Sequence, residues 1–393
     1  MNIILFDVDC RKQLYPLTEI RPASELRVGI TTIREKWESY LSGSYSFLTE
    51  EYLSGRYPLR VEEINLFIEG NILPTFGFVF TLTQLDAGEA VSYNGRIVAY
   101  KGSMEEFTTK QYVRIIEFNE SLVVIDYNYR VFQYNGEAIK SDFFYMTKGH
   151  VSKELPSSNC VIGNPIDEEG RPLIFIEEGV TIECCILNVK EGPIYIGKNA
   201  NIMEGSMIRG PFAADEGCVV NMGTKIYGAT TLGPYCKVGG ELSNVVLMAY
   251  SNKGHDGFLG NAVLGQWCNI GAGTSASNLK NDYTEVKLWN NAIRRFEKTG
   301  LQFCGLVMGD YSRIGVNVML NTATMIGVGC NVYGAGFPRN FITSFQEGGA
   351  SGMELVHFKK FLSTLETMMD RRKYTISPEE KEICEYLFNE SDT

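Results

Sequence analysis

The sequence predicts an α/β domain followed by a parallel β-helix and a helical tail. Residues 1–150 contain short apolar runs separated by glycine, proline and asparagine, which is typical of an α/β domain. Across residues 161–338 an aliphatic residue returns at every sixth position, a period that fits neither a lone helix nor a simple alternating strand. Residues 151–160 are polar and lack periodicity, so we expect a linker there. Residues 339–393 show helical patterning.

Composition narrows the class of protein. With 393 residues the chain is too long for one ordinary core, and 44% hydrophobic with 21% charged residues is the balance of a soluble globular protein. A net charge of −11 argues against a broad polyanion-binding face, so we expect no nucleic-acid partner. The ten cysteines show no paired metal spacing. The apolar run before Asp7 is far shorter than a membrane span, and we expect a cytoplasmic protein without a membrane partner.

Elements of the first domain follow from its apolar runs. Asn2–Phe6 predicts a buried strand that opens an α/β unit. Thr31–Leu41 predicts a helix, because its apolar side chains fall on one face. Further runs between turn-forming residues predict four more strands, at Ile64–Ile68, Phe78–Leu82, Ile97–Tyr100 and Leu122–Ile125.

The period of six continues in three series, from Ile196 to Val238, from Phe258 to Ala276 and from Met308 to Val332. Glycine often follows the register residue and relieves a tight corner. We expect each hexapeptide to form one short strand and a corner, so that three of them make one triangular turn. Two irregular segments, Asn244–Gly257 and Leu279–Gly305, interrupt the register. Such protrusions are natural places for functional residues.

One stretch of the array contains a chemically distinctive residue, His255, which is one of three histidines in the chain. The surrounding pattern runs without gaps through Ser251, Gly254-His255, Leu259-Gly260, Ala262, Leu264-Gly265 and Asn269-Ile270-Gly271-Ala272-Gly273-Thr274. It closely resembles the acetyltransferase half of the bifunctional N-acetylglucosamine-1-phosphate uridyltransferase/glucosamine-1-phosphate acetyltransferases, in their divergent, shortened bacterial form. This resemblance to hexapeptide-repeat transferases implies a left-handed β-helix and a homotrimer with sites between neighbouring prisms.

The chemistry of acetyl transfer suits His255 as a general base. An amine is mostly protonated at neutral pH, and a group that titrates near pH 6.5 can take its proton. The resemblance places Glu241 beside His255, where it would orient the imidazole. Backbone N–H groups near these residues or in the Asn269–Thr274 corner could stabilise the oxyanion. The alternative is that His255 caps a turn and Glu241 is a solvated charge.

The resemblance also assigns ligand contacts. Asn269 would contact the sugar, whereas Ala272, Asn278 and Leu279 would lie along acetyl-CoA. The two asparagines could instead be corner residues or part of an asparagine ladder inside the coil.

Three substrate positions depart from the family pattern. Lys225 replaces an arginine, so a side chain that can bind phosphate in a bidentate manner is exchanged for a single point charge. Ser243 replaces a lysine and Phe258 replaces a tyrosine. A further family lysine could correspond to Lys280 or Lys287.

The opening of the chain carries a second resemblance. Asn2–Glu38 contains a strand, a basic loop and an Arg-Pro element, and it resembles the start of the sugar-1-phosphate nucleotidyltransferases. This resemblance implies that Arg11 and Arg21 face nucleotide phosphates, for which an arginine fork is well suited. Asn71 falls where the family binds catalytic Mg²⁺. As an alternative, the two arginines are solvated loop cations.

The same loop departs from the family at two positions. Asp7 and Asp9 replace loop glycines, and carboxylates at this place repel phosphates unless a metal bridges them. In the tail, an apolar stripe from Leu355 to Met369 predicts one helix, and Ser377-Pro378 predicts the start of another.

Three functional hypotheses follow. The first is a bifunctional enzyme that acetylates glucosamine-1-phosphate from acetyl-CoA and also joins a nucleoside triphosphate to a sugar-1-phosphate with Mg²⁺. The second is a nucleotidyltransferase whose β-helix serves trimerisation and regulation. The third is a sugar-nucleotide-binding scaffold without catalysis. The small-molecule partners are therefore an amino-sugar phosphate and a nucleoside triphosphate.

Overall fold

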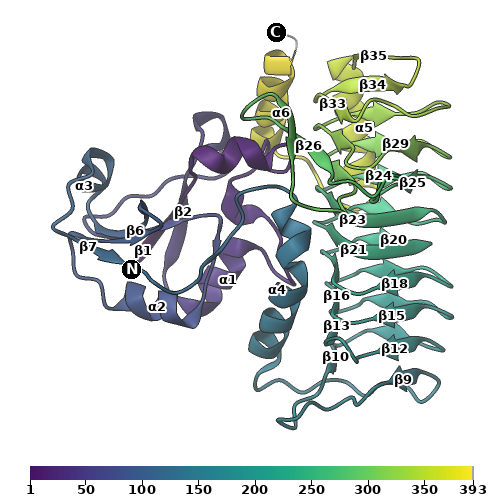
Figure 1. The fold of residues 1–393 in the computed structure, drawn as a ribbon, viewed down its shortest axis with the longest axis horizontal. Coiled ribbons are helices and arrows are strands. Elements are labelled where there is room, and N and C mark those ends of the chain that lie inside the picture. The colour runs from purple at the N-terminus through teal and green to yellow at the C-terminus, as the bar shows by residue number, and fades with distance from the viewer. Residues whose placement is uncertain (392–393) are drawn as a thin grey trace.

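The computed structural model describes residues 1–391. An α/β domain lies beside a long prism of stacked parallel strands, and two C-terminal helices pack near the upper end of the prism (Figure 1). The fold class predicted from the sequence is confirmed in this outline: an α/β domain, a curled array of parallel strands and terminal helices.

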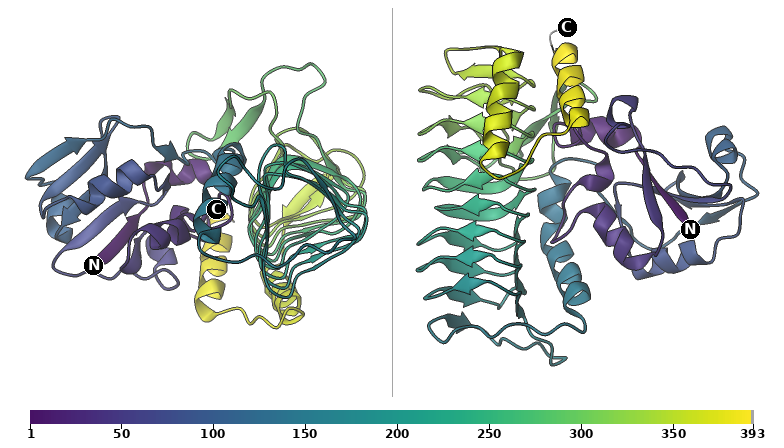
Figure 2. Two further views of the ribbon diagram at one scale, coloured as in Figure 1. Left: turned by 90° about the horizontal axis from the view of Figure 1, so that it is seen from below. Right: turned by 180° about the vertical axis from the view of Figure 1, so that it is seen from behind.

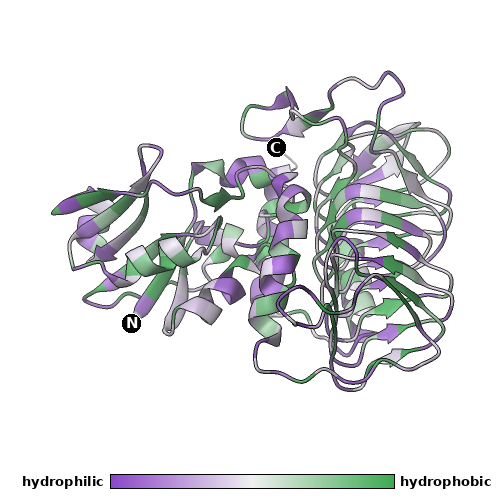
Figure 3. Ribbon diagram, turned by 60° about the horizontal axis from the view of Figure 1, so that its bottom comes forward, coloured by the Kyte–Doolittle hydropathy of each residue, from purple (hydrophilic) through white to green (hydrophobic). Residues whose placement is uncertain are grey.

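The first domain is built on a six-stranded sheet in the order β2-β1-β3-β6-β5-β7. Its strands are β1 (Asn2–Phe6), β2 (Ser44–Leu48), β3 (Asn65–Glu69), β5 (Glu89–Tyr93), β6 (Arg96–Gly102) and β7 (Arg114–Glu117). β1 pairs in parallel with β2 and β3, whereas β6 runs antiparallel to β3 and β5. β4 (Ile72–Leu73) and β8 (Val123–Val124) form a separate pair. The central strands are hydrophobic and buried (Figure 3).

Helices of this domain are α1 (Ile33–Tyr40), α2 (Phe76–Thr83), α3 (Met104–Thr109) and α4 (Arg130–Thr147). The predicted helix near residue 31 is confirmed as α1, and Thr32 and Glu35 cap it reciprocally. The predicted strand Phe78–Leu82 is wrong, because this segment lies in α2. The Thr75 hydroxyl accepts from the Phe78 N–H there, and the buried Phe78 and Leu82 are spaced for one helix face.

The prism has three faces, which we name by their surroundings. The docked face lies against the first domain and contains β10 (Ile174–Ile176), β13 (Ile194–Ile196), β16 (Phe212–Ala214), β19 (Thr230–Leu232), β28 (Val307–Met308), β31 (Met325–Ile326) and β33 (Phe341–Ile342). The open face contains β9 (Cys160–Ile162), β12 (Ile186–Asn188), β15 (Met207–Arg209), β18 (Lys225–Tyr227), β25 (Ser275–Ala276) and β30 (Met319–Leu320). β21 (Glu241–Leu247) and β23 (Phe258–Leu264) begin on the open face and end on the docked face.

The third face, the cleft face, forms one ten-stranded sheet. Its members are β11 (Thr181–Ile182), β14 (Asn201–Ile202), β17 (Val219–Val220), β20 (Lys237–Val238), β22 (Asn252–Lys253), β24 (Asn269–Ile270), β29 (Arg313–Ile314), β32 (Asn331–Val332), β34 (Gln346–Gly349) and β35 (Gly352–Leu355). The strands therefore continue beyond residue 338, the expected end of the array. Seen along the stack, successive coils superpose (Figure 2). A hairpin of β26 (Lys287–Asn290) and β27 (Arg295–Lys298) occupies the second irregular segment.

The sixfold register sets the interior of the prism. All residues of the first series, from Ile196 to Val238, are at most 3% exposed. The third series is buried in the same way. The second series starts one residue later than predicted, because Leu259 is buried whereas Phe258 is half-buried.

The two domains pack tightly. α4 lies along the docked face against β16, β19, β21 and β23. The Thr231 hydroxyl donates to the Gly29 carbonyl at 3.0 Å, and Arg27 pairs with Asp215 at 3.0 Å. Arg21 forms a buried ion pair with Asp310. These contacts fix the first domain against one side of the prism.

Both predicted tail helices are present as α5 (Phe358–Asp370) and α6 (Pro378–Ser391). Phe361, Leu365 and Met369 of α5 are buried in a cluster with Trp267 and Phe345 at the corner between the docked and cleft faces. No helix within residues 1–391 is both long enough and apolar enough to cross a membrane.

Candidate functional site

His255 lies on the ridge between the cleft face and the open face. It belongs to a corner of four residues, Gly254–Gly257, that joins β22 to β23. The equivalent corner of the next coil is Gly271–Thr274, and the Gly273 N–H donates to the Asp256 carbonyl at 2.9 Å. The ridge therefore places His255 directly beside the glycine-rich corner that the sequence singled out.

Two glycines of the preceding coil make room for this corner. A Cβ on Gly239 would lie 2.5 Å from the Gly254 carbonyl oxygen. A Cβ on Gly240 would lie 2.8 Å from the His255 carbonyl oxygen, and this residue also has φ of 77°. The close stacking of the two corners thus depends on glycine at both positions.

A cleft of about 800 Å³ borders the ridge on the side of the cleft face. Strands β20, β22 and β24 supply residues to it, and the C-terminal end of α5 contributes from the opposite side. His255, Asn269 and Ala272 all line it, so three of the predicted site residues are brought together. The His255 imidazole is exposed and has no hydrogen bond or ion pair within residues 1–391.

Three cations line the same cleft: Lys237, Arg371 and Arg372. Arg372 donates to the Asn252 side chain at 3.1 Å, which directs it toward the cleft face. The rings of Tyr250 and Trp267 stack with centroids 4.2 Å apart at the cleft margin. Positive charge next to aromatic surface is chemistry that suits a phosphorylated organic ligand.

A second group of predicted residues lies across the ridge, on the open face. Lys225, Glu241 and Phe258 are register partners on adjacent strands β18, β21 and β23. Ser243 is the partner of Gly260. These side chains are therefore neighbours on one surface that meets His255 at the ridge.

Asn278 joins this open-face group. A Cβ on Gly260 would lie 2.6 Å from both the Asn278 Nδ2 and the Phe258 Cζ, so the two side chains converge over Gly260. Asn278 Nδ2 donates to the Asn261 side chain at 2.7 Å. Leu279 begins the irregular segment and bridges to Phe303. Glu241 and His255 share no hydrogen bond among the described residues.

Arg11 lines a cavity of about 520 Å³ in the first domain, together with Asp7, Asp9 and Glu50. It follows β1 in a short 3-10 helix (Asp9–Leu14), and it is only 3% exposed. Its guanidinium pairs with Asp7 at 3.1 Å and donates to the hydroxyls of Tyr15 at 3.0 Å and Tyr52 at 2.9 Å. Arg11 is therefore a buried, paired cation and not a solvated one.

Arg21 is also buried, at 1% exposure, and it faces the prism. It donates to the Leu17 carbonyl at 3.2 Å and pairs with Asp310 of the prism. In this structure its charge joins the two domains.

Asn71 lies just beyond β3 at the carboxyl edge of the parallel strands. Its amide donates to the Ile125 carbonyl at 3.1 Å, and its buried Oδ1 has no partner. Glu69 is fully buried and pairs with Arg96 at 2.9 Å, and burial raises its pKa to about 7. Residues 1–391 contain no group of three or more His, Cys, Asp or Glu side chains placed to hold a metal ion. One neutral oxygen beside an ion-paired carboxyl does not fit a resident Mg²⁺.

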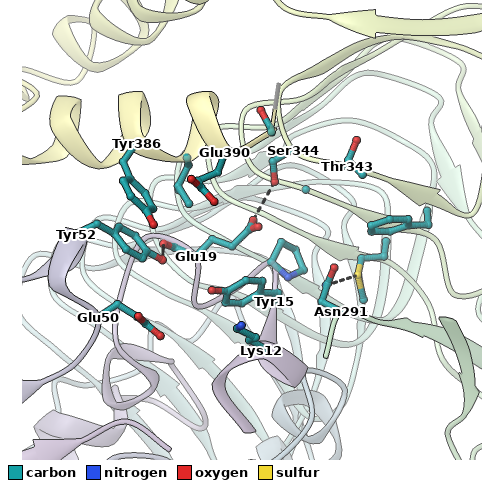
Figure 4. A pocket seen from close by; sticks show the side chains of 16 residues that line it. Lys12, Tyr15, Glu19, Glu50, Tyr52, Asn291, Thr343, Ser344, Tyr386 and Glu390 are labelled. Carbon is teal, nitrogen blue, oxygen red and sulfur yellow. Dashed lines mark hydrogen bonds between the residues drawn. The ribbon is translucent and has the colours of Figure 1, made fainter. Parts of the chain in front are cut away.

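A second cavity, of about 410 Å³, lies where the first domain, the prism and α6 meet (Figure 4). Glu19 points into it and accepts from the Ser344 hydroxyl at 3.0 Å. Burial raises the pKa of Glu19 to about 7. The rings of Tyr52 and Tyr386 stack at 4.4 Å on its wall. This cavity is part of the domain junction.

Several residues of the His255 cleft were not identified from the sequence. Lys237, Arg371 and Arg372 come from distant segments, and only the docking of α5 on the prism brings them together. Lys253, which is buried behind the cleft wall, was missed as well, because a lysine in the sequence suggests a surface charge even at a register position that is otherwise apolar.

Comparison with known proteins finds similarity to sugar nucleotidyl transferases and to bifunctional relatives. Residues 3–151 match the family model described as sugar nucleotidyl transferase. A bifunctional sugar-1-phosphate nucleotidylyltransferase/acetyltransferase of Sulfurisphaera tokodaii is 25% identical over 60% of this chain and 56% of its own length. The bifunctional protein GlmU of Rippkaea orientalis is 25% identical over 40% of this chain and 41% of its own length.

The chain spans about half the length of these curated relatives. A solved Arabidopsis UDP-N-acetylglucosamine acyltransferase matches 56% of this chain and 80% of its own, at 11% identity and a TM-score of 0.24. The chain is thus related to the bifunctional sugar-1-phosphate nucleotidylyltransferase/acetyltransferases, and its first domain matches the sugar nucleotidyl transferase family.

Proposed function

We propose that this protein transfers an acetyl group from acetyl-CoA to the amine of an amino-sugar phosphate, with glucosamine-1-phosphate as the first candidate. The observation that carries the proposal is the position of His255. Its exposed imidazole stands at the edge of a cleft of about 800 Å³ that also contains Asn269, Ala272 and three cations.

In the proposed reaction, the amine nitrogen of the sugar attacks the thioester carbonyl while the His255 imidazole takes a proton from it. A C–N bond forms, the C–S bond breaks, and the departing thiolate receives the proton from the imidazolium. The tetrahedral intermediate carries an oxyanion that needs donors. Among the described residues, the backbone N–H groups of Asp256 and Ala272 donate to no protein acceptor, so they are available for this role.

The two sides of the ridge suit two ligands. The cleft side holds Ala272 with Lys237, Arg371 and Arg372, and we assign it to acetyl-CoA, whose phosphates need cations. The open-face side holds Lys225, Glu241, Ser243 and Phe258, and we assign it to the amino-sugar phosphate, with Asn269 at the boundary. Asn278, which the resemblance assigns to acetyl-CoA, converges with Phe258 on this side, so we place it where the two ligands would meet. Lys225 offers a point charge for the sugar phosphate. Glu241 would orient the imidazole once the ligands are bound.

The test is release of CoA thiol from acetyl-CoA in the presence of glucosamine-1-phosphate. His255→Ala should reduce kcat by about 10²–10⁴-fold, the usual contribution of a general base. His357→Ala serves as the control, because His357 is exposed at the start of α5 and lies outside the cleft. An inactive wild type with every amino-sugar phosphate tried would contradict the proposal.

Nucleotidyl transfer to a sugar-1-phosphate is the second candidate, and the match of residues 3–151 to a sugar nucleotidyl transferase family supports it. Mg²⁺-dependent pyrophosphate release from UTP and a sugar-1-phosphate tests it. Activity here without thiol release would favour a nucleotidyltransferase with a regulatory β-helix, and UTP binding without either activity would favour a scaffold.

We also propose a homotrimer. The open face exposes apolar side chains of Ile162, Ile186, Met207 and Tyr227, which are 38–44% exposed. The proposed acceptor residues lie on the same face. Light scattering coupled to size exclusion should give three times the mass of 44.0 kDa, and a monomer would contradict the proposal.

A further inference from the structure

One lysine lies inside the β-helix. On the cleft face the inward-facing register row includes Ile182, Ile202, Val220, Val238, Ile270, Ile314 and Val332, all at most 3% exposed. Lys253 takes the position between Val238 and Ile270, and it is 1% exposed. Burial of an ammonium group is unfavourable unless hydrogen bonds and charge compensate it. A lysine in this row therefore requires a physical reason.

The Lys253 amine reaches the ridge from the interior of the prism. Its Nζ donates to the Gly239 carbonyl at 3.1 Å and to the His255 carbonyl at 2.8 Å. Gly239 belongs to one corner of the ridge and His255 to the next. Lys253 thus ties two consecutive corners together at the residue we propose as the general base. Burial lowers the pKa of Lys253 to about 8, while the Asp256 carboxylate opposes this effect.

Neighbouring corners of the same ridge are closed without any charge. The Thr224 hydroxyl donates to the Asn221 carbonyl at 2.5 Å, and the Thr274 hydroxyl donates to the Gly315 carbonyl at 2.8 Å. A short neutral side chain is therefore sufficient to close a corner of this prism. The charged tie occurs at the His255 corner.

We propose that Lys253 is a positioning residue for His255. By holding the His255 carbonyl toward the interior, the ammonium fixes the peptide plane and keeps the imidazole outward at the edge of the cleft. This role rests on the proposed acetyl transfer and deepens it, because it names a group that acts through His255 without touching a ligand.

The test uses the small number of histidines. Carbonyl-¹³C histidine labelling gives three signals, from His150, His255 and His357. The signal that is lost in His255→Ala is the one from His255. Lys253→Met keeps the length of the side chain and removes the donor. It should shift the His255 signal alone and reduce kcat for acetyl transfer about tenfold or more, while KM for acetyl-CoA stays within twofold. Lys198→Met, an exposed lysine in an early coil, controls for the change in net charge.

A measurement on the wild type covers the case in which Lys253→Met does not fold. The His255 carbonyl signal should move with an apparent pKa near 8 as Lys253 titrates, whereas the other two carbonyl signals should not. An unchanged His255 signal in the variant, or no such titration in the wild type, overturns the inference. A normal kcat in Lys253→Met overturns it too. If the wild type lacks acetyl transfer but the signal responds, the proposed function fails while the structural tie stands.

Discussion

At the scale of single residues, burial decides what each charged group can do. In the sequence, Arg11 and Arg21 look like exposed loop cations. In the structure both are buried and paired, Arg11 with Asp7 and Arg21 with Asp310. His255 has the opposite environment, since its imidazole is exposed and has no protein partner among the described residues. A base that must accept a proton from a ligand needs such freedom. Sequence reasoning selected His255 as a candidate from its neighbours, but it could not show that Arg11 and Arg21 are buried and paired.

Glu19 allows a pH prediction at this scale. Burial raises its pKa to about 7, above the ordinary value of 4.5 that the unfolded chain retains. Between these values the folded protein holds a proton that the unfolded chain has released, so stability falls as pH rises from about 5 to 7. The free energy of unfolding should therefore decrease with pH by up to about 3 kcal/mol less in Glu19→Gln than in the wild type.

The measurement is urea unfolding at pH 5, 6, 7 and 8 for both proteins. Glu69, whose pKa is also raised to about 7, is present in both and cancels in the difference. Parallel curves for wild type and Glu19→Gln would show that the carboxyl at the domain junction titrates normally.

At the scale of elements, repetition made the prism predictable. Each short strand contributes one inward side chain, so a single period of six located most of the interior. The predicted register is wrong at Phe258. β21 and β23 each continue around a corner of the prism, so the spacing between buried residues there is five, from Leu259 to Leu264, and not six. Lys253 lies six residues before Leu259 and is in register, but it was not predicted to be buried because it is a lysine. In the first domain, Phe78–Leu82 is apolar enough for a strand, and only the Thr75 cap favours a helix.

The end of α5 permits a prediction at this scale. Arg371 and Arg372 are exposed and reach the proposed acetyl-CoA cleft from a helix that the sequence assigned only to packing. Replacement of both by alanine should raise KM for acetyl-CoA by about 10–100-fold, since a hydrogen bond to a charged group contributes about 1.5–3 kcal/mol. Initial rates across a range of acetyl-CoA concentrations measure this.

Lys359→Ala is the matched control, because Lys359 is an exposed cation in the first turn of the same helix and does not line the cleft. An unchanged KM in the double variant would remove α5 from the acyl-donor site.

At the scale of the whole molecule, the two domains act as one packed body. α4 covers one face of the prism, and the Arg21–Asp310 pair is fully enclosed in the interface. Pairwise contacts of this kind, between residues far apart in the chain, cannot be read from local sequence patterns. The assignment of Arg21 to nucleotide phosphates followed from local resemblance alone, and the structure gives this side chain an interdomain partner.

This pair carries the prediction for the whole molecule. Arg21→Met should destabilise the protein by about 3–5 kcal/mol, because it leaves Asp310 buried without its partner. The double variant Arg21→Met/Asp310→Leu should recover much of that loss, since neither charge is then buried. Chemical unfolding of the two single variants and the double variant completes the cycle. Additive losses would show that the two side chains are not coupled.

The Arg21–Asp310 contact also has a consequence in time. The partners are 289 positions apart, so a ribosome that adds 5–20 residues per second needs roughly 15–60 s to make the second after the first. During that interval Arg21 lacks its partner, and the surface of α4 stays incompletely covered until synthesis has passed β23, which packs against it. Synthesis of this protein therefore includes a vulnerable period set by chain length, in which a chaperone that shields the α4 surface would have the most effect.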